Sequence, residues 1–303
     1  MAEILDFSKH DHLIRTTAAD EYIRAFAVTC RGVTEEARKR HGLTPVVSAA
    51  LGRTMAAALM MGIDLKNDTD VMTIQYDCDG PIGGMTVTAD SSGHVKGYAY
   101  QPKVSLPLKP NGKLDVGKAV GKGTLRVMKD IGLKDTYNGT VEIQSGEIGE
   151  DIAYYFAVSE QVPSVVSLGV LVDPVRDRIL QTGGFMIQLM PDCPEETVSE
   201  LERRCKDLPQ ITTMLSEGGT PETILEKVLG GMGLRIHDSR QVSFRCNCSR
   251  QRVEKALLAM GETEIRSLID EGMPVTLNCG FCNTDYTFSI NELKALLDKG
   301  VKK

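Results

Sequence analysis

The sequence predicts an α+β fold in three parts: a large N-terminal domain of antiparallel sheet with packed helices, a helical linker, and a small C-terminal domain with four paired cysteines. Three observations support this prediction. Short β-type runs alternate with glycine-containing turns over residues 1–191, a proline-divided helical stretch follows, and the cysteines lie near the C-terminus. A length of 303 residues also favours two domains over one.

The N-terminal domain, residues 1–191, begins with a predicted strand and a predicted buried helix. Apolar and polar residues alternate loosely from Glu21 to Thr29, which predicts a half-buried strand. Thr44 followed by Pro45 is typical of a helix N-terminus, because proline fits the first helical position. The apolar sequence that follows predicts a buried helix to about Gly62.

The rest of this domain reads as strands separated by turns, with one more helix. A helix over Gly146–Gln161 would place Ile152, Tyr155 and Phe156 toward the core. Asp-Gly and Asn-Gly pairs predict turns at Asp79-Gly80, Asn111-Gly112 and Asn138-Gly139. Strands are predicted at Val71–Tyr76, Met85–Ala89, Val95–Tyr100, Thr124–Met128, Thr140–Ile143, Val165–Val172 and Ile179–Met190.

The linker, residues 192–233, is predicted as short amphipathic helices divided by prolines. Its leucines and isoleucines form an apolar face that must pack on something. The C-terminal domain, residues 234–303, has a predicted strand, two helices, a hairpin and a terminal helix that opens with a capping box at Ser289–Glu292. These elements are predicted at Gln241–Phe244, Ser249–Met260, Thr263–Glu271, Val275–Phe288 and from Ser289 to Gly300.

Composition excludes several classes of function. The net charge of −6 argues against a large phosphate-binding surface, so no nucleic-acid partner is expected. The N-terminus lacks the apolar stretch of a secretory signal, and Ser48, Arg53 and Asp64 interrupt the most apolar region, so no membrane span is expected. We therefore expect a cytoplasmic protein, in which eight cysteines are not a static disulfide framework.

Four of the cysteines have the spacing of a metal site. Cys246 and Cys248 are two residues apart, so in a strand both sulfurs would point to one face. Cys279 and Cys282 form a C-x-x-C turn, for which Gly280 offers a permissive backbone. Two such pairs supply the four thiolates that zinc prefers in closed structural sites, so one structural Zn²⁺ per chain is expected.

A zinc–thiolate site is also oxidisable, because the thiolate is the reactive form of cysteine. Arg245, Arg250 and Arg252 flank the first pair and would offset its negative charge, or they form an ordinary solvated face. Oxidation would pair cysteines and remove the metal-binding energy, on the order of 10–16 kcal/mol in small zinc modules. A module of about 70 residues has little else to hold it together, so it should unfold.

The sequence resembles the redox-regulated 33-kDa heat-shock chaperones, the heat-shock protein 33 family. The likeness covers nearly the whole chain in the expected order. It is carried by Leu51-Gly52-Arg53, Gly80-Pro-Ile-Gly-Gly, Gly146-Glu-Ile-Gly-Glu-Asp151, Tyr155-Phe156, Ser159-Glu160-Gln161, Pro163-Ser164, Gly183-Gly184-Phe185 with Gln188, Val242-Ser-Phe-Arg-Cys-Asn-Cys-Ser-Arg, and Cys279-Gly-Phe-Cys282 with Tyr286 and Phe288.

This resemblance implies an ATP-independent chaperone, or holdase, that is not an enzyme and that binds unfolding client proteins under oxidative stress. It implies that the reduced, zinc-bound form is inactive. Oxidation would form the disulfides Cys246–Cys248 and Cys279–Cys282, release zinc, unfold the C-terminal module with the linker, and favour a homodimer. Cys30, Cys78, Cys193 and Cys205 lie outside the family's motif. Cys193 and Cys205, in the linker, add the possibility of further disulfides.

Other interpretations have weaker support. The main alternative is a zinc ribbon that docks nucleic acid or a protein partner, although the C-terminal domain is only slightly basic. A thiol–disulfide oxidoreductase using Cys279 and Cys282 lacks the usual βαβ context. The segment Gly112–Ala119 is close to a phosphate-binding loop but has alanine in place of the metal-binding hydroxyl. It leads to β-type sequence rather than a helix, so a hairpin with basic turn residues is expected there. Met55, Met60 and Met61 are expected to fill the core rather than bind clients.

Overall fold

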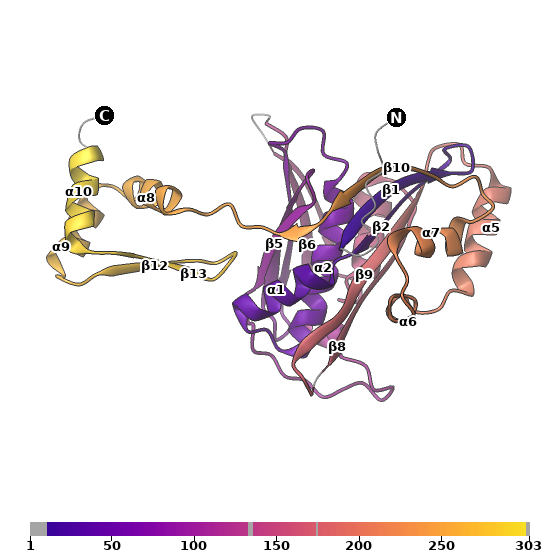
Figure 1. The fold of residues 1–303 in the computed structure, drawn as a ribbon, viewed down its shortest axis with the longest axis horizontal. Helices are drawn as coiled ribbons and strands as arrows, with labels where there is room; N and C mark the ends of the chain where they lie inside the picture. The colour runs from indigo at the N-terminus through magenta and orange to yellow at the C-terminus, as the bar shows by residue number, and fades with distance from the viewer. Residues whose placement is uncertain (1–10, 133–135, 174, 301–303) are drawn as a thin grey trace. The chain divides into compact units, whose positions relative to one another are not determined.

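The computed structural model describes residues 11–132, 136–173 and 175–300, and the chain divides into two compact units, residues 1–245 and 246–303 (Figure 1). The fold is α+β, as predicted. Antiparallel sheets and packed helices make up the first unit, and the four paired cysteines lie in the second.

Two β-sheets form the framework of the first unit. The five-stranded sheet has the order β10-β1-β2-β9-β8, and the six-stranded sheet has the order β11-β5-β4-β3-β6-β7. All pairings are antiparallel except that of β5 with β11. The strands are β1 (His12–Ala18), β2 (Ile23–Thr29), β3 (Val71–Cys78), β4 (Gly84–Asp90), β5 (His94–Ala99), β6 (Gly123–Asp130), β7 (Tyr137–Glu142), β8 (Ser164–Asp173), β9 (Arg178–Leu189), β10 (Arg235–Gln241) and β11 (Ser243–Phe244).

Helix α2 (Pro45–Gly62) packs against strands of both sheets and forms the centre of the core (Figure 1). Every residue of α2 except Pro45 and Arg53 is buried, including the three methionines predicted to fill the core. By length and composition α2 would be able to cross a membrane, but 89% of its apolar window is buried inside the protein. This burial identifies α2 as a core helix of the first unit, as the sequence predicted.

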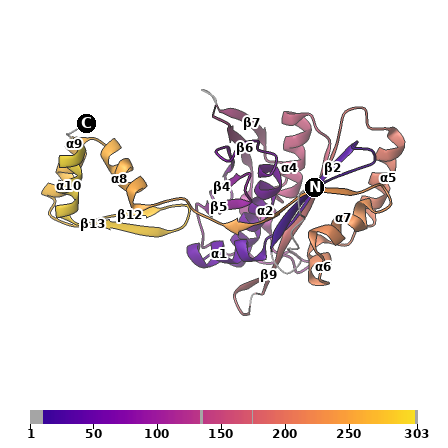
Figure 2. The ribbon, with the colours of Figure 1, turned by 45° about the horizontal axis from the view of Figure 1, so that its top comes forward.

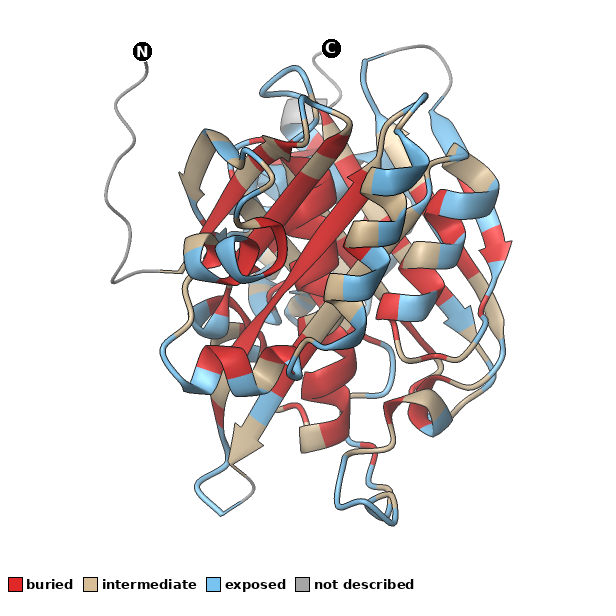
Figure 3. Ribbon diagram, turned by 90° about the vertical axis from the view of Figure 1, so that its right-hand side faces the viewer, coloured by how far each residue is buried: buried red, intermediate tan, exposed pale blue. Residues whose placement is uncertain are grey.

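The linker helices cover the opposite face of the five-stranded sheet. They are α5 (Glu195–Lys206), α6 (Ile211–Ser216) and α7 (Pro221–Leu229). Alternate residues of β2 point to opposite sides, so Phe26 lies in the core around α2 while Ala25 and Ala27 pack with the linker helices. Strands β1, β2 and β9 of this sheet are therefore buried on both faces (Figure 3). Strand β2 is more deeply buried than the half-buried strand that its alternation predicted.

The boundary between the two units lies at residues 245/246, whereas the predicted domain boundaries were at residues 191/192 and 233/234. Strand β10 pairs with β1 along its length, from His12 opposite Gln241 to Thr17 opposite Arg235. Strand β11 pairs with β5. Because β10 and β11 complete the two sheets and the linker helices bury their apolar faces on one of them, the first unit extends to Arg245.

Several elements differ from those expected. Strand β1 and helix α1 (Arg31–His41) were not predicted; α1 buries only Val33, Thr34 and Ala37, so its sequence carries little apolar periodicity. The segment Val116–Val120 forms a short helix, α3, where β-type sequence was expected.

The region around residues 137–160 holds two more differences. The predicted helix at Gly146–Gln161 is observed as α4 (Gly149–Tyr155), followed by a π-helical turn, η1 (Phe156–Glu160). The expected turn at Asn138-Gly139 lies inside β7. A Cβ atom at Gly139 would lie 2.4 Å from Ser159 Oγ and 2.8 Å from the Tyr155 ring, so glycine is required there by close packing.

The second unit is small. It contains α8 (Arg250–Ala259), α9 (Glu262–Asp270), a hairpin of β12 (Val275–Cys279) and β13 (Thr284–Phe288), and α10 (Ile290–Gly300) (Figure 2). The predicted capping box is present, since Ser289 N–H donates to Glu292 Oε2 at 2.8 Å and Glu292 N–H donates to Ser289 Oγ at 3.4 Å. The buried apolar side chains of this unit are Leu257, Ile265, Phe288, Leu293, Leu296 and Leu297.

Candidate metal centre

Two chain segments bring the four predicted cysteines together. Cys246 and Cys248 lie in an irregular segment between β11 and α8, not in a strand as expected. Cys279 is the last residue of β12, and Cys282 lies in the turn that leads to β13. In that turn Asn283 has the left-handed backbone (φ 54°), and its N–H donates to Cys279 O at 2.7 Å. This tight turn brings the Cys282 sulfur to the same side of the hairpin as the Cys279 sulfur.

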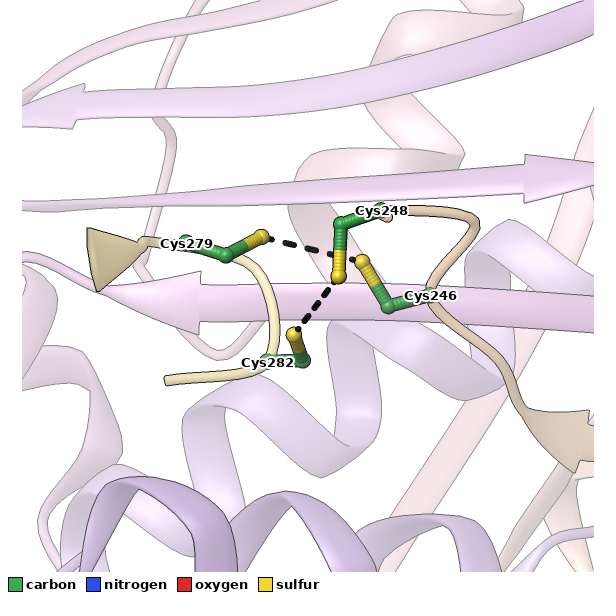
Figure 4. Close-up of side chains that lie close together, drawn as sticks. All are labelled: Cys246, Cys248, Cys279 and Cys282. Atoms are coloured by element: carbon green, nitrogen blue, oxygen red, sulfur yellow. Dashed lines mark hydrogen bonds between the residues drawn. The ribbon is translucent and has the colours of Figure 1, made fainter. Parts of the chain in front are cut away.

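The four sulfurs form one compact cluster (Figure 4). All Sγ atoms lie within 4.8 Å of one another. The Sγ atoms of Cys246 and Cys279 are 3.8 Å apart, and those of Cys248 and Cys282 are 3.3 Å apart. All four cysteines are free thiols in this structure. Since each sulfur lies near every other, the distances do not select one disulfide pairing over another.

Two polar residues of β13 complete the cluster. The Tyr286 hydroxyl donates to Cys248 Sγ at 3.1 Å, and the Thr284 hydroxyl lies 3.3 Å from Cys282 Sγ. Sequence reasoning did not assign these contacts. The signal was present, because Cys282, Thr284 and Tyr286 follow one another at a spacing of two, which places them on one face of an extended strand. Phe288 continues this series into the small core.

The thiols have unequal acidity because they share a confined space. Burial raises the pKa of Cys246 to about 12 and also raises the pKa of Cys279. At Cys282 burial is outweighed by hydrogen bonds with Thr284, Cys248 and Cys279, which lower its pKa to about 7. The hydrogen bond to Cys248 raises the pKa of the Tyr286 hydroxyl to about 12. Four thiolates cannot coexist at these distances unless a cation balances their charge.

The donor set fits zinc. Tetrahedral zinc with four thiolate ligands at about 2.3 Å has sulfurs about 3.8 Å apart. The Cys246–Cys279 distance equals this value, the Cys248–Cys282 distance of 3.3 Å is shorter, and no Sγ–Sγ distance exceeds 4.8 Å. Cys282 is buried and the other three cysteines are partly buried, as in closed structural sites rather than open catalytic ones. The arrangement supplies a preformed tetrathiolate site in a small unit of the protein.

Other candidates near the cysteines have different partners. Arg250 donates to Glu292 Oε1 at 2.6 Å and to Thr287 O at 3.0 Å, and its guanidinium lies 4.2 Å from the Phe288 ring centroid. Arg245 contacts the His94 ring at 3.2 Å, and the Arg252 side chain is exposed. His237 is an exposed residue of β10 and lies within 2.6 Å of the Thr17 hydroxyl. Arg250 and Arg245 thus tie together parts of their own units.

The remaining cysteines are spread over the first unit. Cys30 is fully buried, and Cys78, Cys193 and Cys205 are partly buried. Burial raises the pKa of Cys30 and raises that of Cys78 to about 11. Both thiols are therefore protonated at neutral pH and poor nucleophiles.

Comparison with known proteins assigns the family. A sequence model of the Hsp33 protein family matches residues 11–289. The chain is 50% identical to a 33 kDa chaperonin of Agathobacter rectalis over 94% of its own length and 99% of that protein. It is 48% identical to a 33 kDa chaperonin of Clostridioides difficile over 95% of its own length and 98% of that protein.

A solved structure agrees with these relatives. The crystal structure of the 33 kDa chaperonin (heat shock protein 33 homolog) from Thermotoga maritima matches with a TM-score of 0.90 and 37% identity, covering 97% of this chain and 100% of that one. The resemblance inferred from the sequence motifs is confirmed over nearly the full length. This chain belongs to the Hsp33 family of chaperones.

Proposed function

We propose that this chaperone is an ATP-independent holdase, without enzymatic activity, whose client binding is switched on by oxidation of its four clustered thiols. The observation that carries the proposal is the position of these sulfurs, within 4.8 Å of one another in a unit with only a small core. A four-cysteine cluster with metal-site spacing fits a reducing compartment better than a static disulfide framework, and we take this compartment to be the cytoplasm. Family membership favours this function over a zinc ribbon that docks nucleic acid.

The second unit depends on its thiols for stability. Among the described residues, its core has six buried apolar side chains besides Cys282, in a segment of fewer than 60 residues, a size at which metals or disulfides are usually needed. When bound, Zn²⁺ would supply cross-linking energy on the order of 10–16 kcal/mol, which is also folding energy. Cys246, Cys248, Cys279 and Cys282 would hold it, and Tyr286 and Thr284 would orient Cys248 and Cys282.

Oxidation acts on the thiols themselves. One peroxide converts two thiols to a disulfide and two waters, so two peroxides consume all four ligands. We propose Cys246–Cys248 and Cys279–Cys282 as the pairs, because each joins residues that remain close in the sequence when the unit unfolds. A disulfide sulfur no longer carries thiolate charge, so the unit loses its metal ligands and with them most of its stability.

Loss of the second unit reaches the first through the covalent chain. Cys246 follows directly after β11 and β10, the strands that complete the two sheets. Before them lie α5, α6 and α7, whose apolar face rests on Ile14, Ile23, Phe185 and Ile187 of the five-stranded sheet. Helices this short have little stability of their own, so they depend on this docking. Undocking would expose two apolar surfaces at once, the sheet face and the linker.

These surfaces are the proposed client site. A chain unfolding in the cell presents apolar segments, and a large contiguous apolar patch is the feature that binds them. No step of this mechanism uses nucleotide. We propose that the oxidised form is a homodimer. Its interface would cover part of the exposed apolar surface while no client is bound.

The test combines metal, thiol and client measurements on the same samples. Reduced, zinc-loaded protein should bind one zinc per chain and leave a heat-unfolding client to aggregate. Peroxide-treated protein should lose its zinc, contain the two proposed disulfides in a non-reducing digest, and suppress light scattering without nucleotide. If the client scattered as much light with oxidised, zinc-free protein as in a blank without it, the holdase proposal would be refuted. Absence of zinc from reduced, freshly purified protein would refute the switch.

A further inference from the structure

The linker carries two cysteines outside the metal centre, one at each end of helix α5 (Figure 1). Cys193 lies immediately before Pro194, the N-cap residue of the helix, and Cys205 is in the last turn of the helix. Eleven residues separate the two cysteines. The helix between them decides whether they can react with each other.

An intact α5 keeps the two thiols apart. Pro194 O accepts hydrogen bonds from the N–H groups of Thr197 and Val198, so Pro194 already lies on the helix. A rise of 1.5 Å per residue puts the Cα atoms of Pro194 and Cys205 about 16 Å apart along the axis. Cys193 lies one peptide from Pro194, so its Cα stays at least about 12 Å from that of Cys205. A disulfide needs Cα atoms within about 7 Å.

Helix α5 is held in place by α7, against which it packs (Figure 2). Leu201 is buried in the apolar cluster beneath the linker helices. The Arg204 guanidinium donates to Gly230 O at 2.6 Å and to Val228 O at 3.2 Å, the carbonyls at the end of α7. Cys205 packs against the same cluster, and burial raises the pKa of its thiol. The docked helix therefore both separates the thiols and keeps Cys205 unreactive.

From these positions we propose that Cys193 and Cys205 form a third disulfide, which can close only after α5 has unfolded and which then prevents the linker from docking again. The inference rests on the proposed function, since oxidation of the second unit is what releases the linker. In an unfolded linker the eleven-residue spacing gives each thiol an effective concentration of about millimolar at the other.

The chemistry is a two-electron oxidation. The two thiols lose two protons and two electrons, peroxide accepts both and becomes two waters, and the sulfur–sulfur bond forms. Closure to within about 7 Å is incompatible with the helix between Pro194 and Cys205, so Leu201 and Arg204 cannot return to their partners on α7. The linker stays open until a thiol reductant gives two electrons back to the sulfurs.

The experiment uses full-length, zinc-loaded protein treated with peroxide at a temperature that unfolds the linker, followed by thiol counting and a non-reducing digest. Wild-type protein should fall from eight free thiols to two, Cys30 and Cys78. Cys193→Ser should fall from seven to three, and the cross-linked peptide that joins residues 193 and 205 should be absent. Cys78→Ser, a matched control outside the linker, should retain that peptide. Cys205→Ala checks the other partner.

The functional consequence is measured after reductant is added. Oxidised Cys193→Ser should still hold client, but it should recover helicity and release client sooner than the wild type. Oxidised wild-type protein that holds client without the cross-linked peptide would overturn this inference and leave the proposed function intact. If Cys193→Ser and the wild type recovered helicity and released client at the same rate, the claim that the disulfide prevents the linker from docking again would be overturned. A cross-link found in protein with native helicity would also overturn it, because α5 would then not be the barrier.

Discussion

The two units of this chain are stabilised by different means. The first buries helix α2 between two sheets and covers the outer face of one sheet with three more helices. The second has six buried apolar side chains and four sulfurs within 4.8 Å of one another. Hydrophobic burial does not respond to an oxidant, whereas thiolate ligands do. In the proposed mechanism, an oxidant therefore acts on the second unit while the two sheets and helix α2 of the first stay folded.

The linker helices lie between these two cases. They pack on the stable sheet through residues such as Leu225 and Val228, yet each helix is short and depends on that docking. Cys193 and Cys205 add a redox-sensitive element to a segment otherwise held by apolar contacts. The linker is where a change in the second unit can become a change in exposed apolar surface.

Replacing Cys248 with serine should have the largest effect on stability, and this effect should be greatest in the second unit. It removes one of four ligands and the hydrogen bond from Tyr286, so the metal-dependent stability, on the order of 10 kcal/mol, should be lost. Zinc analysis of the reduced variant should show little metal, and NMR should show an unfolded second unit beside folded sheets and a folded helix α2 in the first unit. Cys78→Ser serves as control, and a full zinc complement in Cys248→Ser would refute the ligand assignment.

Truncating Leu225 to alanine should weaken the docking of the linker. Leu225 is fully buried on α7, and removing such a side chain costs about 2–5 kcal/mol. We expect the reduced, zinc-loaded variant to hold client partially, which light scattering would measure. Lys227→Ala changes an exposed residue of the same helix and should behave like the wild type. If reduced Leu225→Ala held no client, the prediction would be contradicted, because client binding would then not depend on how firmly the linker docks.

Acidification should reveal an ion pair in the first unit. Two hydrogen bonds from Arg38, at 2.9 and 3.0 Å, together with the Ile179 N–H, lower the pKa of Glu35 to about 2. Because the folded pKa lies below the ordinary value near 4.5, this stabilisation is complete above about pH 4.5 and is lost as the pH falls toward 2.

Glu35→Gln tests this assignment. The substitution should cost about 1–2 kcal/mol at neutral pH and flatten the pH dependence of unfolding between pH 2 and 4.5. Denaturant titrations at several pH values would measure both. The exposed pair of Glu36 with Arg40 on the same helix gives the control, since Glu36→Gln should change stability by less than about 0.5 kcal/mol. Parallel pH profiles for Glu35→Gln and wild type would contradict the assignment.

Tyr286→Phe should have the smallest effect. It deletes the hydroxyl that donates to Cys248 Sγ and leaves the ring, so the site should lose the support of one hydrogen bond. Competition with a zinc chelator should show an affinity about two- to fivefold lower. Tyr154→Phe, an exposed tyrosine of the first unit, should leave the affinity unchanged. An unchanged affinity in Tyr286→Phe would mean that the hydroxyl does not support the ligand.

Much of the fold was predictable because its signals are local. The strands of the six-stranded sheet were placed to within a few residues, since alternation and turn residues act over short stretches. Strands β1 and β10 were missed; they pair with each other across more than 200 residues, and no local pattern shows that pairing. The expected turn at Asn138-Gly139 was wrong because Gly139 is required by the approach of Tyr155 and Ser159, which no local pattern shows.

The sequence by itself showed which four of the eight cysteines come together, because their paired spacing is typical of a metal site. It also showed the family, through motifs spread along the chain. Tertiary structure decided which residues surround the sulfurs and where the first unit ends. Thr284 and Tyr286 reach the cluster only through the β12–β13 hairpin. Strands β10 and β11 join the first unit by pairing with β1 and β5, and pairing between distant segments depends on the folded sheets rather than on local sequence.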